Sequence, residues 1–66
     1  MELTVNGESV HLVDVKTVGD LLDHFGVSHQ AIAVVANGTI VARDAFEHYA
    51  IHPKDAIDII RFVGGG

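Results

Sequence analysis

The chain has 66 residues, of which 48% are apolar, 20% are charged and none is cysteine. A domain of this size forms one small core, so a buried catalytic cavity is not expected beside it. Nine acidic residues against four Lys or Arg give a formal charge of −5. The cations are not clustered in the sequence, and nucleic-acid binding, which needs clustered cations, is therefore not expected.

The composition also indicates where the protein works. Without cysteine there can be no disulfide, thiolate metal site or cysteine nucleophile, and a reducing compartment is acceptable. No basic segment or apolar run follows Met1, and no stretch approaches the ~20 apolar residues of a membrane span. We expect a cytoplasmic protein with no membrane contact, and the acidic charge favours a basic surface on a protein partner.

The first 12 residues predict a β-hairpin. Apolar residues alternate with polar ones on both sides of Asn6-Gly7, at Leu3, Val5, Val10 and Leu12. Alternation around Asn-Gly is a strong hairpin signal, because both residues accept the positive φ of a tight turn.

A short helix follows. Thr17 is placed as its N-cap, with Asp20 completing an approximate capping box, and Gly26 stands where a left-handed C-terminal cap is wanted. One apolar stripe at helical spacing comprises Val18, Leu21, Leu22 and Phe25.

The second half of the chain predicts three more strands. Residues 32–36 are an apolar run typical of a buried central strand, and Asn37-Gly38 turns the chain back into a strand at residues 39–42. Residues 43–49 are irregular or form a brief helical turn, residues 52–55 form a turn around Pro53, and residues 57–63 form the last strand.

The two faces of this last strand differ. Alternation places Ile57, Ile59, Arg61 and Val63 on one face and Asp58, Ile60 and Phe62 on the other. We assign Ile57 and Ile59 to the core. Ile60 and Phe62 then lie on the face that no helix covers, where exposed apolar residues indicate an interface more than a second core. Arg61 is expected to pair with an acid on a partner or within the domain.

The element order predicts an α+β fold of the ubiquitin-like β-grasp type, with one main helix packed across a mixed sheet of four to five strands. Residues 1–63 form the domain and residues 64–66 form a flexible glycine tail. Three glycines serve no folding purpose, because glycine weakens ordered structure. A frayed end or a leftover linker explains them as well as a function does.

A functional tail has a chemical rationale. A carboxylate that enters the narrow active site of another enzyme needs a chain without side chains, and glycine provides it. Attack of the Gly66 carboxylate on the α-phosphate of ATP gives an acyl-adenylate. A sulfur nucleophile can then displace AMP and leave a thiocarboxylate, while the partner supplies Mg²⁺ and the catalytic groups.

Over essentially its whole length the chain resembles the ThiS family of sulfur carriers in thiamine biosynthesis. The matching stretches are LTVNGE (3–8), TVGDLL (17–22), VVANGTIVAR (34–43) and DAIDIIRFVGGG (55–66). Each stretch is common by itself, and their order and spacing make the resemblance specific. Two departures are the third glycine, Gly64, and Ala42 before Arg43, where the family often has proline.

The resemblance implies a protein co-substrate and not an enzyme. By this analogy a ThiF-type adenylyltransferase activates Gly66 with ATP and Mg²⁺, and a ThiG-type thiazole synthase receives the sulfur. The chain itself binds no cofactor or metal. Gly65 is the second tail glycine, and the expected docking residues are Ile60, Arg61, Phe62 and Gly64.

Three other interpretations stay open. The small subunit of molybdopterin synthase has the same fold and tail but is usually longer, and a ubiquitin-like modifier would form isopeptides with lysines. An enzyme is the third, since five histidines invite metal chemistry: His11, His24, His29, His48 and His52. His48 and His52 are four residues apart, but Pro53 argues against one helix there and no acid stands at ligand spacing, so isolated surface histidines are expected. Asp20 and Asp23 are expected to be solvated, without a catalytic role.

Overall fold

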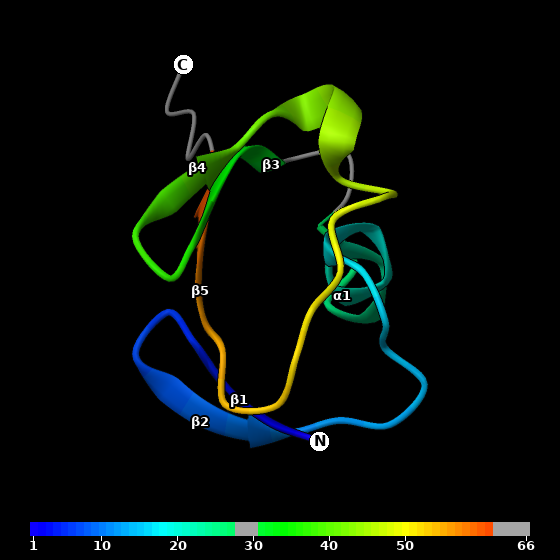
Figure 1. Ribbon diagram of the computed structural model, residues 1–66, viewed down its shortest axis with the longest axis vertical. Coiled ribbons are helices and arrows are strands. Elements are labelled where there is room, and N and C mark those ends of the chain that lie inside the picture. Colours follow the sequence, from blue (N-terminus) through cyan, green and yellow to red (C-terminus); the bar gives the residue numbers. More distant parts are fainter. Residues whose placement is uncertain (28–30, 62–66) are drawn as a thin grey trace.

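The computed structural model describes residues 1–27 and 31–61. Its elements in chain order are β1 (Glu2–Val5), β2 (Glu8–His11), α1 (Val18–His24), β3 (Ala31–Ala36), β4 (Thr39–Val41), the 3-10 turn η1 (Arg43–Ala45) and β5 (Ala56–Arg61). The five strands form one sheet in the order β2-β1-β5-β3-β4. The β1–β5 pair is parallel, and the other neighbours are antiparallel. In Figure 1 the sheet curves along one side of the molecule and α1 lies across from it.

Both hairpins form around their Asn-Gly turns, as predicted. Asn6 and Gly7 have φ values of 51° and 82°, and Asn37 and Gly38 have nearly the same values, 51° and 83°. Positive φ at both central residues gives a turn whose twist matches that of the flanking strands, which explains why Asn-Gly occurs at both places.

The helix is delimited as its sequence indicates. The Thr17 hydroxyl accepts the backbone N–H of Asp20, and the Asp20 carboxylate accepts the N–H of Thr17, which completes the capping box. Hydrogen bonds from the backbone N–H groups of Lys16 and Thr17 hold the pKa of Asp20 below its usual value. Gly26 has a φ of +69° just beyond the helix, as the predicted C-terminal cap requires.

The predicted stripe is wrong at its last residue. Val18, Leu21 and Leu22 are fully buried, but Phe25 is the helix C-cap and is 40% exposed. The helix ends at His24, before another turn could direct Phe25 into the core. Phe25 instead makes an edge-to-face contact with His24, whose ring centre lies 5.0 Å away.

The core fills the space between the inner face of the sheet, which faces α1, and the helix. Its fully buried large side chains are Leu3, Val18, Leu21, Leu22, Val34 and Ile57. Ile57 is 1% exposed, and Ile59 is half-buried against the same cluster, so the assignment of both residues to the core is confirmed. Burial of apolar surface at about 25 cal/mol per Å² is the main force that holds so small a domain together.

Two strand predictions need correction. The central strand of the sheet is β5, and β3 lies beside it, second from the edge. Along β3, Val34 and Ala36 are buried while Ala33 and Val35 are only half-buried, because none of the described elements covers the outer face of the sheet. The last strand begins at Ala56, one residue earlier than predicted. Its predicted residues 62 and 63 lie outside the described part of the chain.

The remaining connections agree with the sequence. The segment after β4 contains the single turn η1, and residues 52–55 turn the chain into β5, with Lys54 at a φ of 70°. Within the described ranges, no helix has the length and apolar character that crossing a bilayer requires. The predicted boundary between residues 1–63 and the tail at 64–66 is not tested, because residues 62–66 are not described.

Candidate functional site

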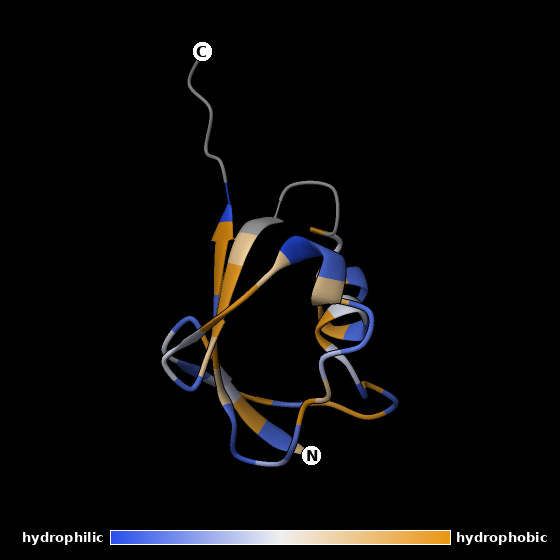
Figure 2. Cartoon of the chain, turned by 45° about the horizontal axis from the view of Figure 1, so that its top comes forward, coloured by the Kyte–Doolittle hydropathy of each residue, from blue (hydrophilic) through white to orange (hydrophobic). Residues whose placement is uncertain are grey.

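The candidate site is the end of β5, the strand that leads toward the last residues of the chain. The structure describes this strand as far as Arg61. Phe62, Gly64, Gly65 and Gly66 all lie outside the described residues. Their predicted roles therefore stay predictions. The structure describes the last residues of β5 before the tail, Ile59 to Arg61, which we call the tail root. Figure 2 shows β5 as an apolar strand with a hydrophilic end.

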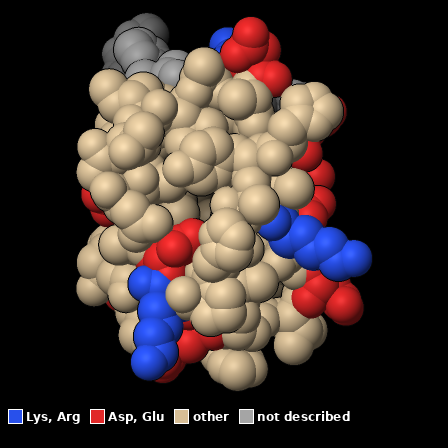
Figure 3. All heavy atoms as spheres, in the orientation of Figure 1, with Lys and Arg blue, Asp and Glu red and all other residues tan. Residues whose placement is uncertain are grey.

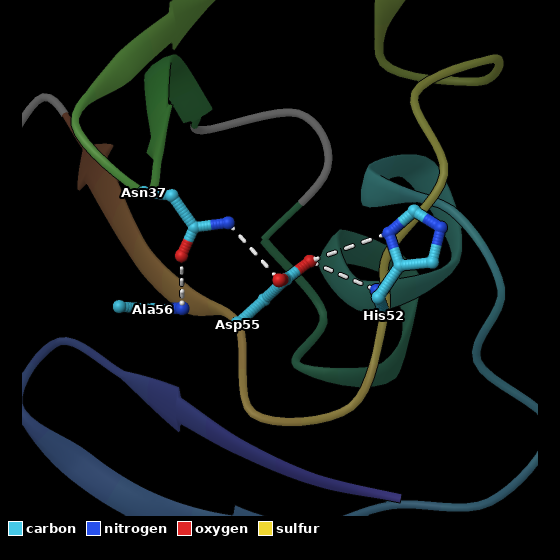
Figure 4. A network of polar contacts seen from close by, with 4 residues as sticks. All are labelled: Asn37, His52, Asp55 and Ala56. Carbon is cyan, nitrogen blue, oxygen red and sulfur yellow. Dashed lines mark hydrogen bonds and ion pairs between the residues drawn. The ribbon is translucent and has the colours of Figure 1, made fainter.

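A polar network fixes the beginning of β5 (Figure 4). The Asn37 side chain accepts the backbone N–H of Ala56 at 2.9 Å and donates to the Asp55 carboxylate at 3.0 Å. The same carboxylate accepts the backbone N–H of His52 at 2.8 Å and lies 3.9 Å from the His52 ring nitrogen Nδ1. This network joins the β3–β4 turn to the start of β5.

The other Asn-Gly turn contacts the opposite half of β5. β1 pairs with β5 only at Thr4↔Ala56 and Val5↔Ile57. Where this ladder ends, Asn6 Oδ1 accepts the backbone N–H of Ile59 at 2.7 Å. The backbone N–H of Asn6 also donates to the C=O of Ile57 at 2.9 Å, so Asn6 extends the pairing of β5 by two hydrogen bonds beyond the last residue of β1.

Ile60 belongs to an apolar surface on the outer face of the sheet. It is 45% exposed and pairs with Ala33 of β3. Val35 of the same strand pairs with Ile40 of β4, which is 75% exposed. Adjacent strands thus bring four apolar residues together, and we call this set, Ala33, Val35, Ile40 and Ile60, the outer patch.

Ile40 was not among the predicted docking residues, although its sequence carried the signal. Ile40 and Val41 are neighbours on β4, and Val41 is buried at 3% exposure. A buried Val41 requires that Ile40 point outward. The sequence could not place Ile40 beside Val35 and near Ile60, because this placement depends on the order and register of three strands.

Arg61 does not join the outer patch. Alternation along β5 places its side chain on the inner face, the face of Ile57 and Ile59. There it lies at the edge of a groove that Phe25 and Ile59 also line. The predicted docking residues Ile60 and Arg61 therefore belong to opposite faces of the same strand.

The other titratable residues form no catalytic cluster within residues 1–27 and 31–61. The described histidines, His11, His24, His48 and His52, are all exposed. His29 lies outside the described residues. In the described ranges no three metal-ligating side chains come together. Asp20 serves the helix cap, and Asp23 is an exposed helix residue.

The charge distribution agrees with a protein partner. On the face shown in Figure 3 the cationic side chains are separated from one another and lie among acids, with no continuous basic surface. With a formal charge of −5, the domain would repel the phosphate backbone of a nucleic acid.

The β-grasp sheet, the central strand that leads toward three glycines and the exposed apolar patch at its end define a small protein of the ubiquitin-like carrier class. The ThiS family model matches residues 3–66, and the chain belongs to the ThiS family.

Individual relatives agree with this membership. The chain is 31% identical to the sulfur carrier protein ThiS of Bacillus subtilis over 65 residues, which cover 97% of this chain and 98% of that protein. The fold is also similar to the crystal structure of a thiamine biosynthesis protein (ThiS) from Geobacter metallireducens. The superposition covers 100% of both chains, with a TM-score of 0.80 and 31% sequence identity. The predicted β-grasp fold and the predicted class, a sulfur carrier of thiamine biosynthesis that acts as a co-substrate, are confirmed.

A longer protein also contains this domain. The chain is 35% identical over 66 residues to a thiazole synthase of Paramagnetospirillum magneticum, and it spans 20% of the length of that protein. A thiazole synthase of Magnetococcus marinus matches at 29% identity, again over 20% of its length. A sequence similar to the whole of this chain thus occurs within proteins named as thiazole synthases.

Proposed function

We propose that the protein carries sulfur on the C-terminal carboxylate of Gly66 as a thiocarboxylate. The observation that supports this most directly is the match of the ThiS family model through to Gly66. The central strand of the sheet leads into this segment. The domain then holds the tail, while Gly65 and Gly64 let its backbone enter an active site without steric hindrance.

The chemistry has two steps. A Gly66 carboxylate oxygen attacks the α-phosphorus of ATP, the bond to pyrophosphate breaks, and an acyl-adenylate forms. Sulfide then attacks the carbonyl carbon, AMP leaves with the carboxylate oxygen, and the thiocarboxylate remains. A ThiF-type adenylyltransferase supplies ATP, Mg²⁺ and the groups that stabilise the developing charge. The carrier contributes only the acid and its position.

The sulfur acceptor in this proposal is a ThiG-type thiazole synthase. Its support is the occurrence of a similar domain within the two thiazole synthases described above. In those proteins the carrier-like domain and the synthase belong to one chain and act at close range. A carrier in a separate chain would have to dock on the synthase instead. We place these reactions in the cytoplasm, where ATP is available.

The outer patch is the docking surface in this proposal. Ile60 is an exposed apolar residue next to the last described residue of β5, and Ile40 is an exposed apolar residue of β4 that Val35 and Ala33 connect to it. An exposed apolar cluster of this kind marks an interaction site. Phe62 has the same parity as Ile60 and is proposed to extend the patch. The acidic domain favours a partner with an apolar surface surrounded by cations.

The tail is tested with an amidated protein. Blocking the Gly66 carboxylate as an amide should leave the melting temperature unchanged and abolish ATP-dependent pyrophosphate release with the adenylyltransferase. Pyrophosphate release at the wild-type rate from the amidated chain would refute the proposal. An intact mass from cells should show one oxygen replaced by sulfur. Conjugates on partner lysines would instead indicate a protein modifier.

Docking is tested with Ile60→Ala and Phe62→Ala, and with Val13→Ala as the matched control. Val13 is 72% exposed but lies in the loop between β2 and α1, outside the sheet. The first two variants should raise the KM of the adenylyltransferase for the carrier with little change in melting temperature. A large loss of stability in Phe62→Ala would show that Phe62 is a core residue.

A further inference from the structure

A second apolar surface lies at the tail root, on the face of β5 opposite to the outer patch. It is a groove of about 230 Å³ between the sheet and the end of α1. It is lined by five apolar residues, Val5, Val10, Phe25, Val27 and Ile59, and by three polar ones, Asn6, Glu8 and Arg61. We call this surface the inner groove.

The size of the inner groove favours an apolar side chain over a metabolite. Pockets for small ligands usually measure roughly 300–1,000 Å³ and contain converging polar groups. This groove is smaller. Phe25 leaves 40% of its surface exposed there, although the sequence pattern places it with the core residues.

The edge of β5 beside the groove is open to another strand. The pairing with β1 stops at Val5↔Ile57, and Asn6 Oδ1 takes the N–H of Ile59. Strand alternation then directs the C=O of Ile59 and the N–H of Arg61 toward the same edge. No described strand lies there. An edge with unpaired N–H and C=O groups is a template for an added strand.

Charge indicates what such a strand carries. Arg61 is exposed, and no described Asp or Glu forms an ion pair with it. Glu8 lines the same groove but forms no ion pair with Arg61. The Arg61 guanidinium is therefore available to a carboxylate of a partner.

We propose that the inner groove and the β5 edge bind an extended segment of a partner protein. This segment pairs with Ile59 and Arg61 through its backbone, places one apolar side chain in the groove and pairs an acidic side chain with Arg61. The inference rests on the proposed function in one respect: the segment belongs to an enzyme that binds the tail and reacts with it.

Such an arrangement would control the direction of the tail. The outer patch and the inner groove lie on opposite faces of the last residues of β5. A partner that holds both faces fixes the position and rotation of the strand before the tail begins. Pre-organisation of this kind lowers the entropic cost of bringing a flexible reactive group to a fixed point.

The test is an NMR titration of the ¹⁵N-labelled full chain with a blocked peptide, Asp-Val-Ile-Val-Thr. The amide signals of Ile59, Arg61 and Phe25 should shift in a saturable manner at millimolar peptide, and hydrogen exchange at the Arg61 amide should slow. A peptide with Pro at the central position, which lacks one backbone N–H, should bind more weakly. Shifts that centre on Ile40 and Ile60, or no saturable shift, would overturn the proposal.

Variants distinguish the contribution of the Arg61 charge to peptide binding from that of the apolar groove. Arg61→Glu should weaken binding of the Asp peptide by about fivefold, as expected for an exposed ion pair, and a peptide with Lys in place of Asp should then bind better than the original. Phe25→Ser should weaken the binding of both peptides, while Ile40→Ser on the outer patch should leave the binding of both unchanged. If Arg61→Glu leaves the preference between the two peptides unchanged, the assigned role of Arg61 is wrong.

The outcome is independent of the proposed chemistry. Pyrophosphate release by the wild-type chain tests Gly66 without any peptide. Peptide binding without pyrophosphate release would leave the inner groove assigned and refute the carrier chemistry, and the reverse result would refute only the inner groove.

Discussion

The two ends of β5 are held in different ways, although each is contacted by an Asn-Gly turn. At the start of the strand, Asn37 bonds to both Ala56 and Asp55, and Asp55 also bonds to His52. At the end of the strand, Asn6 makes a single side-chain hydrogen bond, to the N–H of Ile59. The two turns have nearly identical φ angles, so the difference lies in what surrounds them.

This difference separates stability from function along one strand. The start of β5 is locked by polar contacts and contributes Ile57 to the core. The end has β3 on one side, no described strand on the other and exposed residues on both faces. A strand that is fixed at its base and exposed at its tip fits the proposed role of holding a reactive tail for other proteins.

The largest effect is expected from a matched pair of truncations. Ile57→Ala should cost about 2–5 kcal/mol of unfolding free energy, because it leaves a cavity in the core. Ile60→Ala on the outer patch should cost about 0.5 kcal/mol or less. Urea unfolding of both variants measures the difference. Equal losses would contradict the division between the two ends.

The next effect concerns the turn at the start of the strand. Asn37→Gly keeps the positive φ but removes the hydrogen bonds to Ala56 and Asp55. At about 0.5–1.5 kcal/mol per bond, the expected loss is about 1–3 kcal/mol. Thermal or urea unfolding gives this value, and Gly38→Ala serves as a control that strains the turn without touching the network.

A smaller effect is expected at the other turn. Asn6→Gly removes one hydrogen bond and should cost about 0.5–1.5 kcal/mol. Native-state hydrogen exchange should accelerate at the Ile59 amide and stay unchanged at Ala56. Because both Asn→Gly changes add the same flexibility to the unfolded chain, their difference isolates the network around Asp55. A larger loss of unfolding free energy in Asn6→Gly than in Asn37→Gly would contradict the expected difference between the two turns.

The smallest effect concerns α1, whose cap contacts neither end of β5. The folded-state pKa of Asp20 is lowered from 3.8. Its carboxylate therefore stabilises the fold at pH values above 3.8, and this contribution disappears as the pH falls through the lower folded-state pKa. Asp20→Asn should lower the melting temperature at neutral pH and reduce its dependence on pH under strongly acidic conditions. Identical pH profiles for both proteins would show that the Asp20 charge contributes nothing to the stability of the fold.

Local signals predicted most of the fold. The Asn-Gly pairs fixed the two hairpins, Thr17 and Asp20 fixed the helix start, and the alternation in β5 assigned Ile57 to the core. These predictions succeeded because each depends on residues close together in the sequence. The error at Phe25 had the opposite origin, because periodicity does not show that the helix ends at His24.

The candidate site was predicted only in part. Ile60 was correctly placed on an uncovered face, while Ile40 was missed, and Arg61 lies on the opposite face from Ile60. The position of Arg61 follows from alternation along β5, as predicted, whereas the place of Ile40 in the outer patch depends on which strands become neighbours. The roles of Phe62, Gly64, Gly65 and Gly66 stay predictions to be tested by the experiments above.

By itself the sequence determined the local structure and the family of this protein, because turns, caps, alternation and motif order are properties of nearby residues. Only the tertiary structure decided which side chains meet. The Asn6 side chain bonds to a backbone group 53 residues further along the chain, and the outer patch and inner groove arise from five strands in the order β2-β1-β5-β3-β4. The physical reason is that strand order and register are set by packing of the whole core, to which distant residues contribute together.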